Sequence, residues 1–238
     1  MESTLLSLTG AGFLLLTVVF YGLLYRELKA GIALTSWTAD RQRTVARRYL
    51  VGVSAWAIFL LSVSATGFFT NFDTFPPRLV IVLIVPLVAI ILVVRSSAVK
   101  ELLQLVPARN IIRLQFFRVF VELLIWASFA LDQLPVQMTF EGRNFDVLSG
   151  LFAPIVAYWL ANHKTALYIY NYVALALLIN IVTVAILSTP VPFRVFMNEP
   201  ANLLVTKFPF VMLPGMLVPL AYGLHFLSLR QLGLVQNK

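Results

Sequence analysis

The sequence predicts an all-α, polytopic membrane protein: a single bundle of seven transmembrane helices, with the N-terminus outside and the C-terminus in the cytoplasm. The 238 residues are 60% hydrophobic and only 12% charged, whereas soluble domains carry about 25% charged residues. Seven apolar stretches divide the chain, and the basic residues between them fall mostly on alternate sides. The polar intervals are too short to form a soluble domain, so residues 1–238 are predicted to be one transmembrane domain.

Each predicted span is an apolar run close to the roughly 20 residues that a helix needs to cross the hydrocarbon core. In order, the spans cover residues 5–25, 49–69, 79–94, 111–131, 147–161, 166–187 and 208–229. The third and fifth runs are short, so each either extends into a flanking loop or crosses with little tilt. Six or eight spans remain open alternatives, but seven gives the most consistent distribution of charge.

The basic residues give the predicted orientation. Of the 18, Arg118 is left deep inside a helix, and those assigned to the poorer side are Arg78, Arg143, Arg194 and Lys207. The others, Lys238 included, fall on the opposite side, which the positive-inside rule places in the cytoplasm. The expected location is the plasma membrane, and the expected partners of the basic loops are anionic lipid headgroups rather than nucleic acid. The oligomeric state is left open.

Residues 96–110 follow the third span and have an amphipathic pattern. Val99, Leu102, Leu103 and Val106 fall on one helical face. A short helix at the cytoplasmic interface, stopped by Pro107, explains this pattern. The alternative is that the third span continues straight into the cytoplasm.

The fourth span, 111–131, carries two charges that hydropathy does not explain. Arg118 and Glu122 are one helical turn apart on the same face, and Gln115 precedes them on that stripe. At 1.5 Å per residue, Arg118 lies about 10 Å and Glu122 about 16 Å deep. A charge near mid-membrane costs about 2.5–3.5 kcal/mol or more, so such residues usually pair inside the bundle. We predict either a path that binds a polar group or relays protons, or a structural Arg118–Glu122 ion pair.

Two long loops are predicted on the outer side. Residues 132–146 contain a turn at 141–144, and Asn144 or Asp146 is expected to cap the fifth helix. Residues 188–207 combine prolines and aromatics and are expected to form a cover at the membrane surface. The polar residues of these loops form a candidate external mouth: Asp132, Glu141, Arg143, Asn144, Asp146 and Glu199. The alternative is that they only hold the loops together.

The sixth and seventh spans hold the remaining candidates. Asn180 and Thr183 share a face of the sixth span, where they either line the ligand path or bond a neighbouring helix. Pro214 and Gly215 predict a bend in the seventh span. No cofactor or metal is predicted, because the chain has no cysteine and its two histidines, His163 and His225, have no supporting ligand pattern.

These residues favour a transporter or permease for a small solute, with Arg118 and Glu122 in its path. One alternative is a receptor or sensory membrane subunit that binds a ligand under the external loops. Another is a lipid-handling membrane enzyme with Glu122 or His225 as its acid–base group. An enzyme is the less favoured class, since no catalytic motif is present.

Overall fold

A computed structural model describes residues 2–236 of the chain, and the side chains of residues 3–234. All regular elements in that range are helices, which confirms the all-α prediction. Their bounds are α1 Glu2–Ala33, α2 Ala39–Ala65, η1 Phe68–Thr70, α3 Val80–Arg95, α4 Ser97–Leu103, α5 Ala108–Ile112, η2 Arg113–Phe116, α6 Phe117–Ala130, η3 Val136–Met138, α7 Val147–Trp159, α8 Lys164–Leu187, η4 Leu204–Thr206, η5 Leu213–Leu217 and α9 Val218–Gln236. Lys238 lies outside the described residues.

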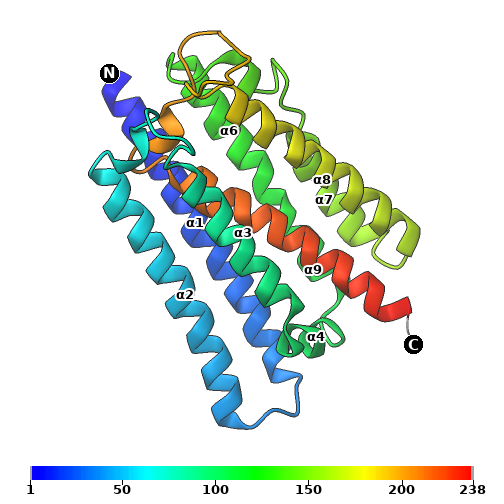
Figure 1. The fold of residues 1–238 in the computed structure, drawn as a ribbon. Coiled ribbons are helices and arrows are strands. Elements are labelled where there is room, and N and C mark those ends of the chain that lie inside the picture. The colour runs from blue at the N-terminus through cyan, green and yellow to red at the C-terminus, as the bar shows by residue number, and fades with distance from the viewer. Residues whose placement is uncertain (1, 237–238) are drawn as a thin grey trace.

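The long helices run between two ends of an elongated bundle (Figure 1). The N-terminus and the loops before α3, before α7 and before α9 gather at one end, and the α1–α2 turn, α4 and the C-terminus lie toward the other. Helix α9 lies at the centre, where it packs against α3, α5 and α8, while α7 packs against α6 and α8. As expected for a bend at Pro214, the chain forms a single π-helical segment, η5, before α9 begins.

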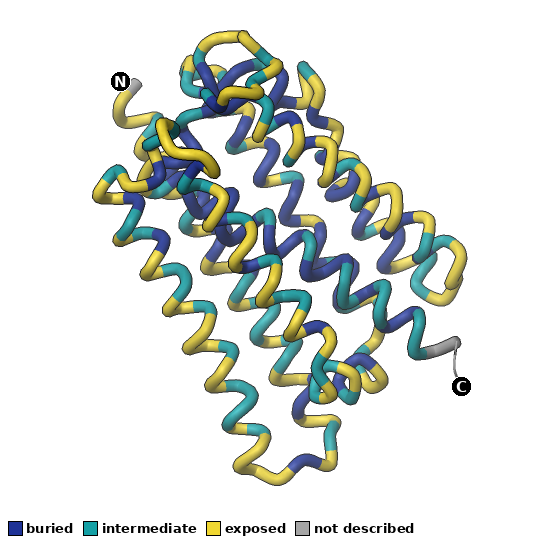
Figure 2. The backbone as a smooth tube through the Cα atoms, in the orientation of Figure 1, coloured by how far each residue is buried: buried dark blue, intermediate teal, exposed yellow. Residues whose placement is uncertain are grey.

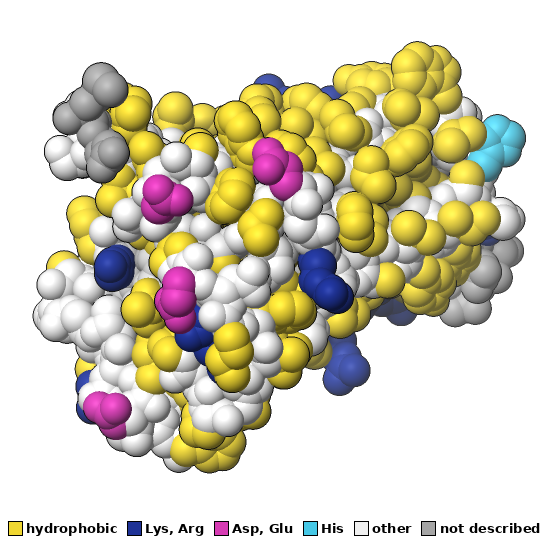
Figure 3. All heavy atoms as spheres, turned by 90° about the horizontal axis from the view of Figure 1, so that it is seen from above, with side chains coloured by type: hydrophobic (Ala, Val, Ile, Leu, Met, Phe, Trp, Pro, Cys, Tyr) yellow, Lys and Arg dark blue, Asp and Glu magenta, His cyan; other side chains and the backbone are white. Residues whose placement is uncertain are grey.

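Among residues 2–236, three helices are long and apolar enough to cross a membrane, or four if α3 and α4 are counted as one bent span. Figure 2 shows that α2 is almost entirely exposed or half-buried. Its outward side chains include Val51 and Ile58, and Leu15 and Val18 are exposed on α1. Seen from the end that holds the N-terminus, apolar side chains cover much of the surface between scattered charges (Figure 3). Apolar surface of this extent is typical of a protein embedded in lipid rather than water.

Helix α4 does not continue α3. The two axes differ by 67°, and the Ser96 hydroxyl at the break accepts a hydrogen bond from the Val99 amide at 3.3 Å. Such a cap begins a new helix. The alternative of a straight cytoplasmic extension of the third span is therefore wrong, and α4 ends before Pro107, as predicted.

Glu101 on α4 is held by two donors from the neighbouring turn and helix. The Trp37 indole N–H and the Arg41 guanidinium both donate to its carboxylate, the latter at 2.8 Å. These hydrogen bonds, the Trp37 bond first, lower the pKa of Glu101. A carboxyl whose folded pKa is lowered stabilises the fold above the ordinary glutamate pKa, and this contribution is lost as pH falls through the lowered value.

We therefore expect Trp37→Phe and Arg41→Ala each to move the Glu101 titration back toward the ordinary glutamate value. Carboxyl ¹³C NMR as a function of pH measures this shift. Arg43→Ala is the control, because Arg43 is exposed on the same helix as Arg41 and is not among the groups that act on Glu101. A Glu101 titration that is the same in both variants as in the wild type would contradict this account.

Candidate functional site

The first turn of α6 places Arg118 inside the bundle with only 2% of its surface exposed. Its Nε and Nη2 atoms donate to the two carboxylate oxygens of Asp146, Nε at 2.6 Å. Nη2 also donates to the Ala174 carbonyl at 3.1 Å, and Nη1 lies 3.0 Å from Nε2 of His225. Every side of the guanidinium is thus occupied by protein groups, and the bidentate pair with Asp146 fixes its orientation.

Glu122 has a different partner. The Asn144 side-chain amide donates to Glu122 Oε2 at 2.5 Å and to the Met138 carbonyl at 2.9 Å. The predicted Arg118–Glu122 pair is wrong, because no described basic nitrogen lies within 4.0 Å of the Glu122 carboxylate. The loop before α7 turns into the bundle, so that Asp146 reaches Arg118 with both oxygens.

The network continues from Arg118 toward the other end of the bundle. His225 Nδ1 lies 3.0 Å from Asn171 Oδ1, and Asn171 Nδ2 donates to Ser228 Oγ at 2.8 Å. Because a guanidinium only donates, His225 Nε2 must accept from Arg118, which places the imidazole proton on Nδ1 facing Asn171. His225 is therefore a neutral bridge between α6 and α8.

The candidate external mouth separates into two groups. Asn144 and Asp146 are buried in the network, and Asp146 does not cap α7 with its side chain, contrary to one expectation. The other members are exposed, and three of them contact neighbouring side chains of the loops and helices, which favours the structural reading of this set. Their contacts are Glu141 with the Trp126 indole at 2.6 Å, Arg143 over the Phe196 ring at 5.3 Å, and Glu199 with Arg194 at 3.0 Å, while Asp132 lies in a left-handed backbone conformation.

The other predicted path residues do not join Arg118. Asn180 and Thr183 are exposed on the outer face of α8, so their prediction as path residues is wrong. Asn180 instead donates to the Arg143 carbonyl at 2.8 Å, which links α8 to the loop before α7. Gln115 is buried and donates to the Ala221 carbonyl of α9 at 3.2 Å. Its side-chain oxygen has no hydrogen-bond partner among the described residues.

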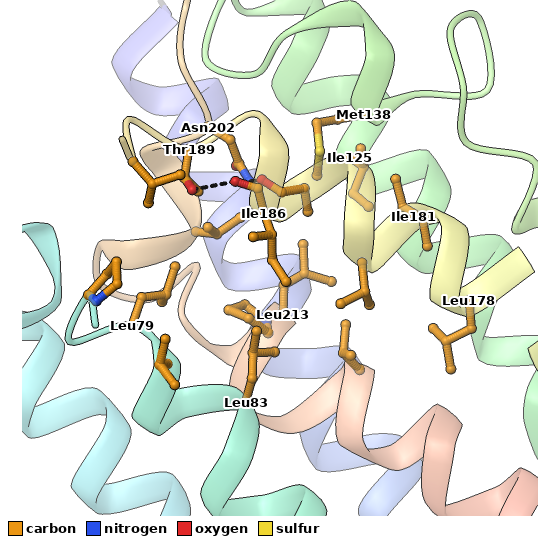
Figure 4. A pocket seen from close by; sticks show the side chains of 18 of the residues that line it. Leu79, Leu83, Ile125, Met138, Leu178, Ile181, Ile186, Thr189, Asn202 and Leu213 are labelled. Carbon is orange, nitrogen blue, oxygen red and sulfur yellow. Dashed lines mark hydrogen bonds between the residues drawn. The ribbon is translucent and has the colours of Figure 1, made fainter. Parts of the chain in front are cut away.

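A cavity of about 140 Å³ lies beside Glu122, between α3, α6, α8 and η5. In Figure 4, Leu79 and Leu83 lie on one side, Leu178 and Ile181 on the other, and Leu213 between them. Only four of the lining residues are polar: Glu122, Asp146, Thr189 and Asn202. No sequence pattern indicates this cavity, because its aliphatic lining has the same pattern as a packed core.

Of the two carboxylates that line the cavity, Asp146 and Glu122, only Asp146 is paired with a described cation. Arg118 neutralises Asp146, and His225 is neutral in the tautomer that its contacts require. Among the described residues, this leaves Glu122 with an amide donor but no cation. A buried carboxylate in this situation either holds a proton or pairs with a cation that enters the site. In the described part of the chain, no cluster of three or more His, Asp or Glu side chains could hold a metal ion.

Comparison with known proteins identifies a family for most of the chain. The model of a family described as a domain of unknown function (DUF8737) matches residues 75–233, a segment that contains Arg118, Glu122, Asp146 and His225. No curated protein and no solved structure matches the chain. Since the matched segment covers well over half of the sequence, the chain belongs to the DUF8737 family.

Proposed function

We propose that this protein is a multi-pass plasma-membrane permease for small lipophilic amines, which it exchanges for protons at Glu122. The proposed topology is the seven-span bundle with the N-terminus outside. It is supported by the three to four membrane-length helices and by the excess of basic residues on one side. The observation that carries the proposal is a carboxylate on the wall of an apolar cavity that has no cationic partner among the described side chains.

The size and lining of the cavity define the apolar part of the ligand. An apolar cavity of about 150 Å³ accepts a molecule the size of benzene, and this one has about 140 Å³. A single aromatic ring or a branched aliphatic group therefore fits. A sugar, an amino acid or an inorganic ion finds too few polar partners there.

Glu122 defines the polar part. An ammonium group on the ligand replaces the proton that a buried carboxylate otherwise holds, so proton and amine compete for one group. Such competition is the basis of exchange, since release of either species favours binding of the other. Arg118 does not take part in binding, because Asp146, His225 and Ala174 occupy it.

The rim of the cavity indicates entry from the side. Val80 at the start of α3, Ile186 near the end of α8 and Phe193 in the following loop all line it and are exposed. An opening bordered by such side chains faces the lipid in the proposed topology. A lipophilic amine dissolved in the outer half of the bilayer thus reaches Glu122 without crossing a polar channel.

Flux in proteoliposomes tests this proposal. We expect wild-type protein to exchange benzylamine for protons, and Glu122→Gln to reduce the exchange by about 10- to 100-fold, the effect of losing one hydrogen bond to a charged group. Ala185→Phe, which fills the cavity, should reduce it similarly. Benzyl alcohol is the neutral probe, and Glu141→Gln, which alters an exposed carboxylate, is the control variant. Benzylamine flux that is unchanged in Glu122→Gln would contradict the proposal.

A receptor is the second candidate, and the loop between α8 and η5 favours it. Thr189, Phe193 and Asn202 of this loop line the cavity. Asn202 anchors it through hydrogen bonds to the Ser188 and Ala185 carbonyls at 2.9 and 3.0 Å. Thermal stabilisation by benzylamine without any flux would support a receptor. An enzyme with His225 as its acid–base group is disfavoured, because His225 does not line the cavity.

A further inference from the structure

A second, basic hollow lies at the opposite end of the bundle from the long loops. It has a volume of about 430 Å³ and is lined by Arg109, Asn110, Arg113, Ala157 and Tyr158. Pro107 precedes α5 and so brings this segment close to α4 and the last turns of α9, whose Gln231 donates to the Leu103 and Val106 carbonyls. In the proposed topology this is the cytoplasmic end.

The hollow is built from donors. Arg113 Nη2 donates to Glu27 Oε1 at 2.6 Å, and Asn110 donates to Glu27 Oε2 at 2.8 Å. Glu27 therefore fixes the two side chains against α1. A guanidinium has five N–H donors, so most of those on Arg113 stay free for a ligand. Arg109, one turn earlier, makes no ion pair with any described acid.

The charge balance of the hollow is positive. No acidic side chain lines it among the described residues, and Glu27 behind it also contacts Arg26 at 3.3 Å. Two guanidiniums with a phenol hydroxyl alongside match the oxygens of a phosphate group. The chemical class of ligand is thus a phosphate-bearing anion.

The surface next to the hollow identifies the source of that phosphate. Tyr158 is 67% exposed, and beyond it an uninterrupted strip of exposed apolar side chains follows α7 toward its start. The strip consists of Leu148, Leu151, Phe152 and Ile155. A phosphate held at Arg109 and Arg113 places the acyl chains of a phospholipid along this strip. Tyr158 and Trp159 then lie at headgroup level, where aromatic residues are enriched.

We propose that Arg109, Arg113 and Tyr158 form a binding site for the headgroup of an anionic phospholipid, whose acyl chains pack on the exposed face of α7. The site is separate from the Glu122 cavity, since the two share no lining residue. It therefore stands whether or not the amine exchange proposed above is correct.

Native mass spectrometry of the purified protein, titrated with short-chain phosphatidylglycerol, tests the site. Arg109→Ala should weaken binding about fivefold, as expected for one basic residue at a membrane surface, and Arg109→Lys should retain most of the affinity. Arg43→Ala is the matched control, because it removes an exposed charge at the same end but outside the hollow. Phosphatidylcholine and soluble glycerol phosphate are the comparison ligands.

Selective loss in Arg109→Ala, with weak binding of phosphatidylcholine and glycerol phosphate, would support the proposal. Equal losses in Arg109→Ala and Arg43→Ala would overturn it, since the attraction would then be spread over all the basic residues of that end. Glycerol phosphate that binds as tightly as the lipid would also overturn it, because the phosphate source would then be soluble. Unchanged thermal stability of Arg109→Ala in phosphatidylcholine nanodiscs would confirm that the variant is folded.

Discussion

Arg118→Met is expected to lower the free energy of unfolding by about 3–5 kcal/mol, the usual cost of removing one partner of a buried ion pair. Arg118 is the hub at which Asp146, His225 and the Ala174 carbonyl meet. Without the guanidinium, the Asp146 carboxylate remains buried with no cation to balance it. Denaturant titration in detergent micelles, followed by tryptophan fluorescence, measures the loss.

Two further variants separate this cost from loss of packing. Arg41→Met removes a half-exposed partner of Glu101 and should lower the free energy of unfolding far less than Arg118→Met does, because exposed ion pairs contribute little. The double variant Arg118→Met/Asp146→Leu should recover much of the loss, because it leaves no uncompensated charge. A loss in Arg118→Met no greater than that in Arg41→Met would show that the buried pair does not stabilise the fold.

Gly150→Ala is expected to lower the free energy of unfolding by about 1–3 kcal/mol through overpacking. Gly150 lies on α7 where it crosses the start of α6. A Cβ there would lie 2.8 Å from the Val119 amide nitrogen and 3.3 Å from Arg118 Cβ. Val119 Cγ2 lies equally close, and because the amide nitrogen belongs to the backbone, the helices must separate, which also draws Asp146 away from Arg118. The same denaturant titration measures the loss.

Gly22→Ala is the matched control, since Gly22 is also helical but, apart from its chain neighbours and the backbone of its own helix, no described atom lies within 4 Å of its added Cβ. A glycine in a helix costs conformational entropy on folding, and alanine removes that cost. The free energy of unfolding of this variant should therefore rise by about 0.5–1 kcal/mol. Equal effects of the two substitutions would show that α6 and α7 are not in close contact at Gly150.

Hydropathy and charge predicted the helical class, the positions of the apolar helices and the burial of Arg118 and Glu122. They did not predict which side chains Arg118 and Glu122 contact. Helical spacing relates Arg118 only to residues one turn away, whereas Asp146 is separated from it by 28 positions and a loop. The sequence does show Asn144 and Asp146 directly before an apolar run, but their approach to α6 depends on how deeply the loop enters the bundle.

Other differences between the predictions and the structure also arise from contacts between helices, which the pattern along one helix does not contain. Asn180 and Asn171 both lie on α8, nine positions apart and therefore on opposite faces of the helix. This spacing did not say which face is inside, and the structure buries Asn171 with His225. The fourth span, read as one helix, is divided by the 3-10 turn η2. The cavity depends on the separation of α3 and α8, which no pattern along one helix records.

The Arg118–Asp146 pair has a consequence for biosynthesis. Its two members lie on α6 and at the start of α7, so that a hairpin of these consecutive helices contains both charges. Because both charges lie within one hairpin, the arginine is neutralised by a carboxylate that follows it directly in synthesis. His225 comes 107 positions after Arg118 and joins only when the last helix has been synthesised. The Arg118–Asp146 pair therefore requires only the α6–α7 hairpin, whereas the His225 contact requires the chain through α9.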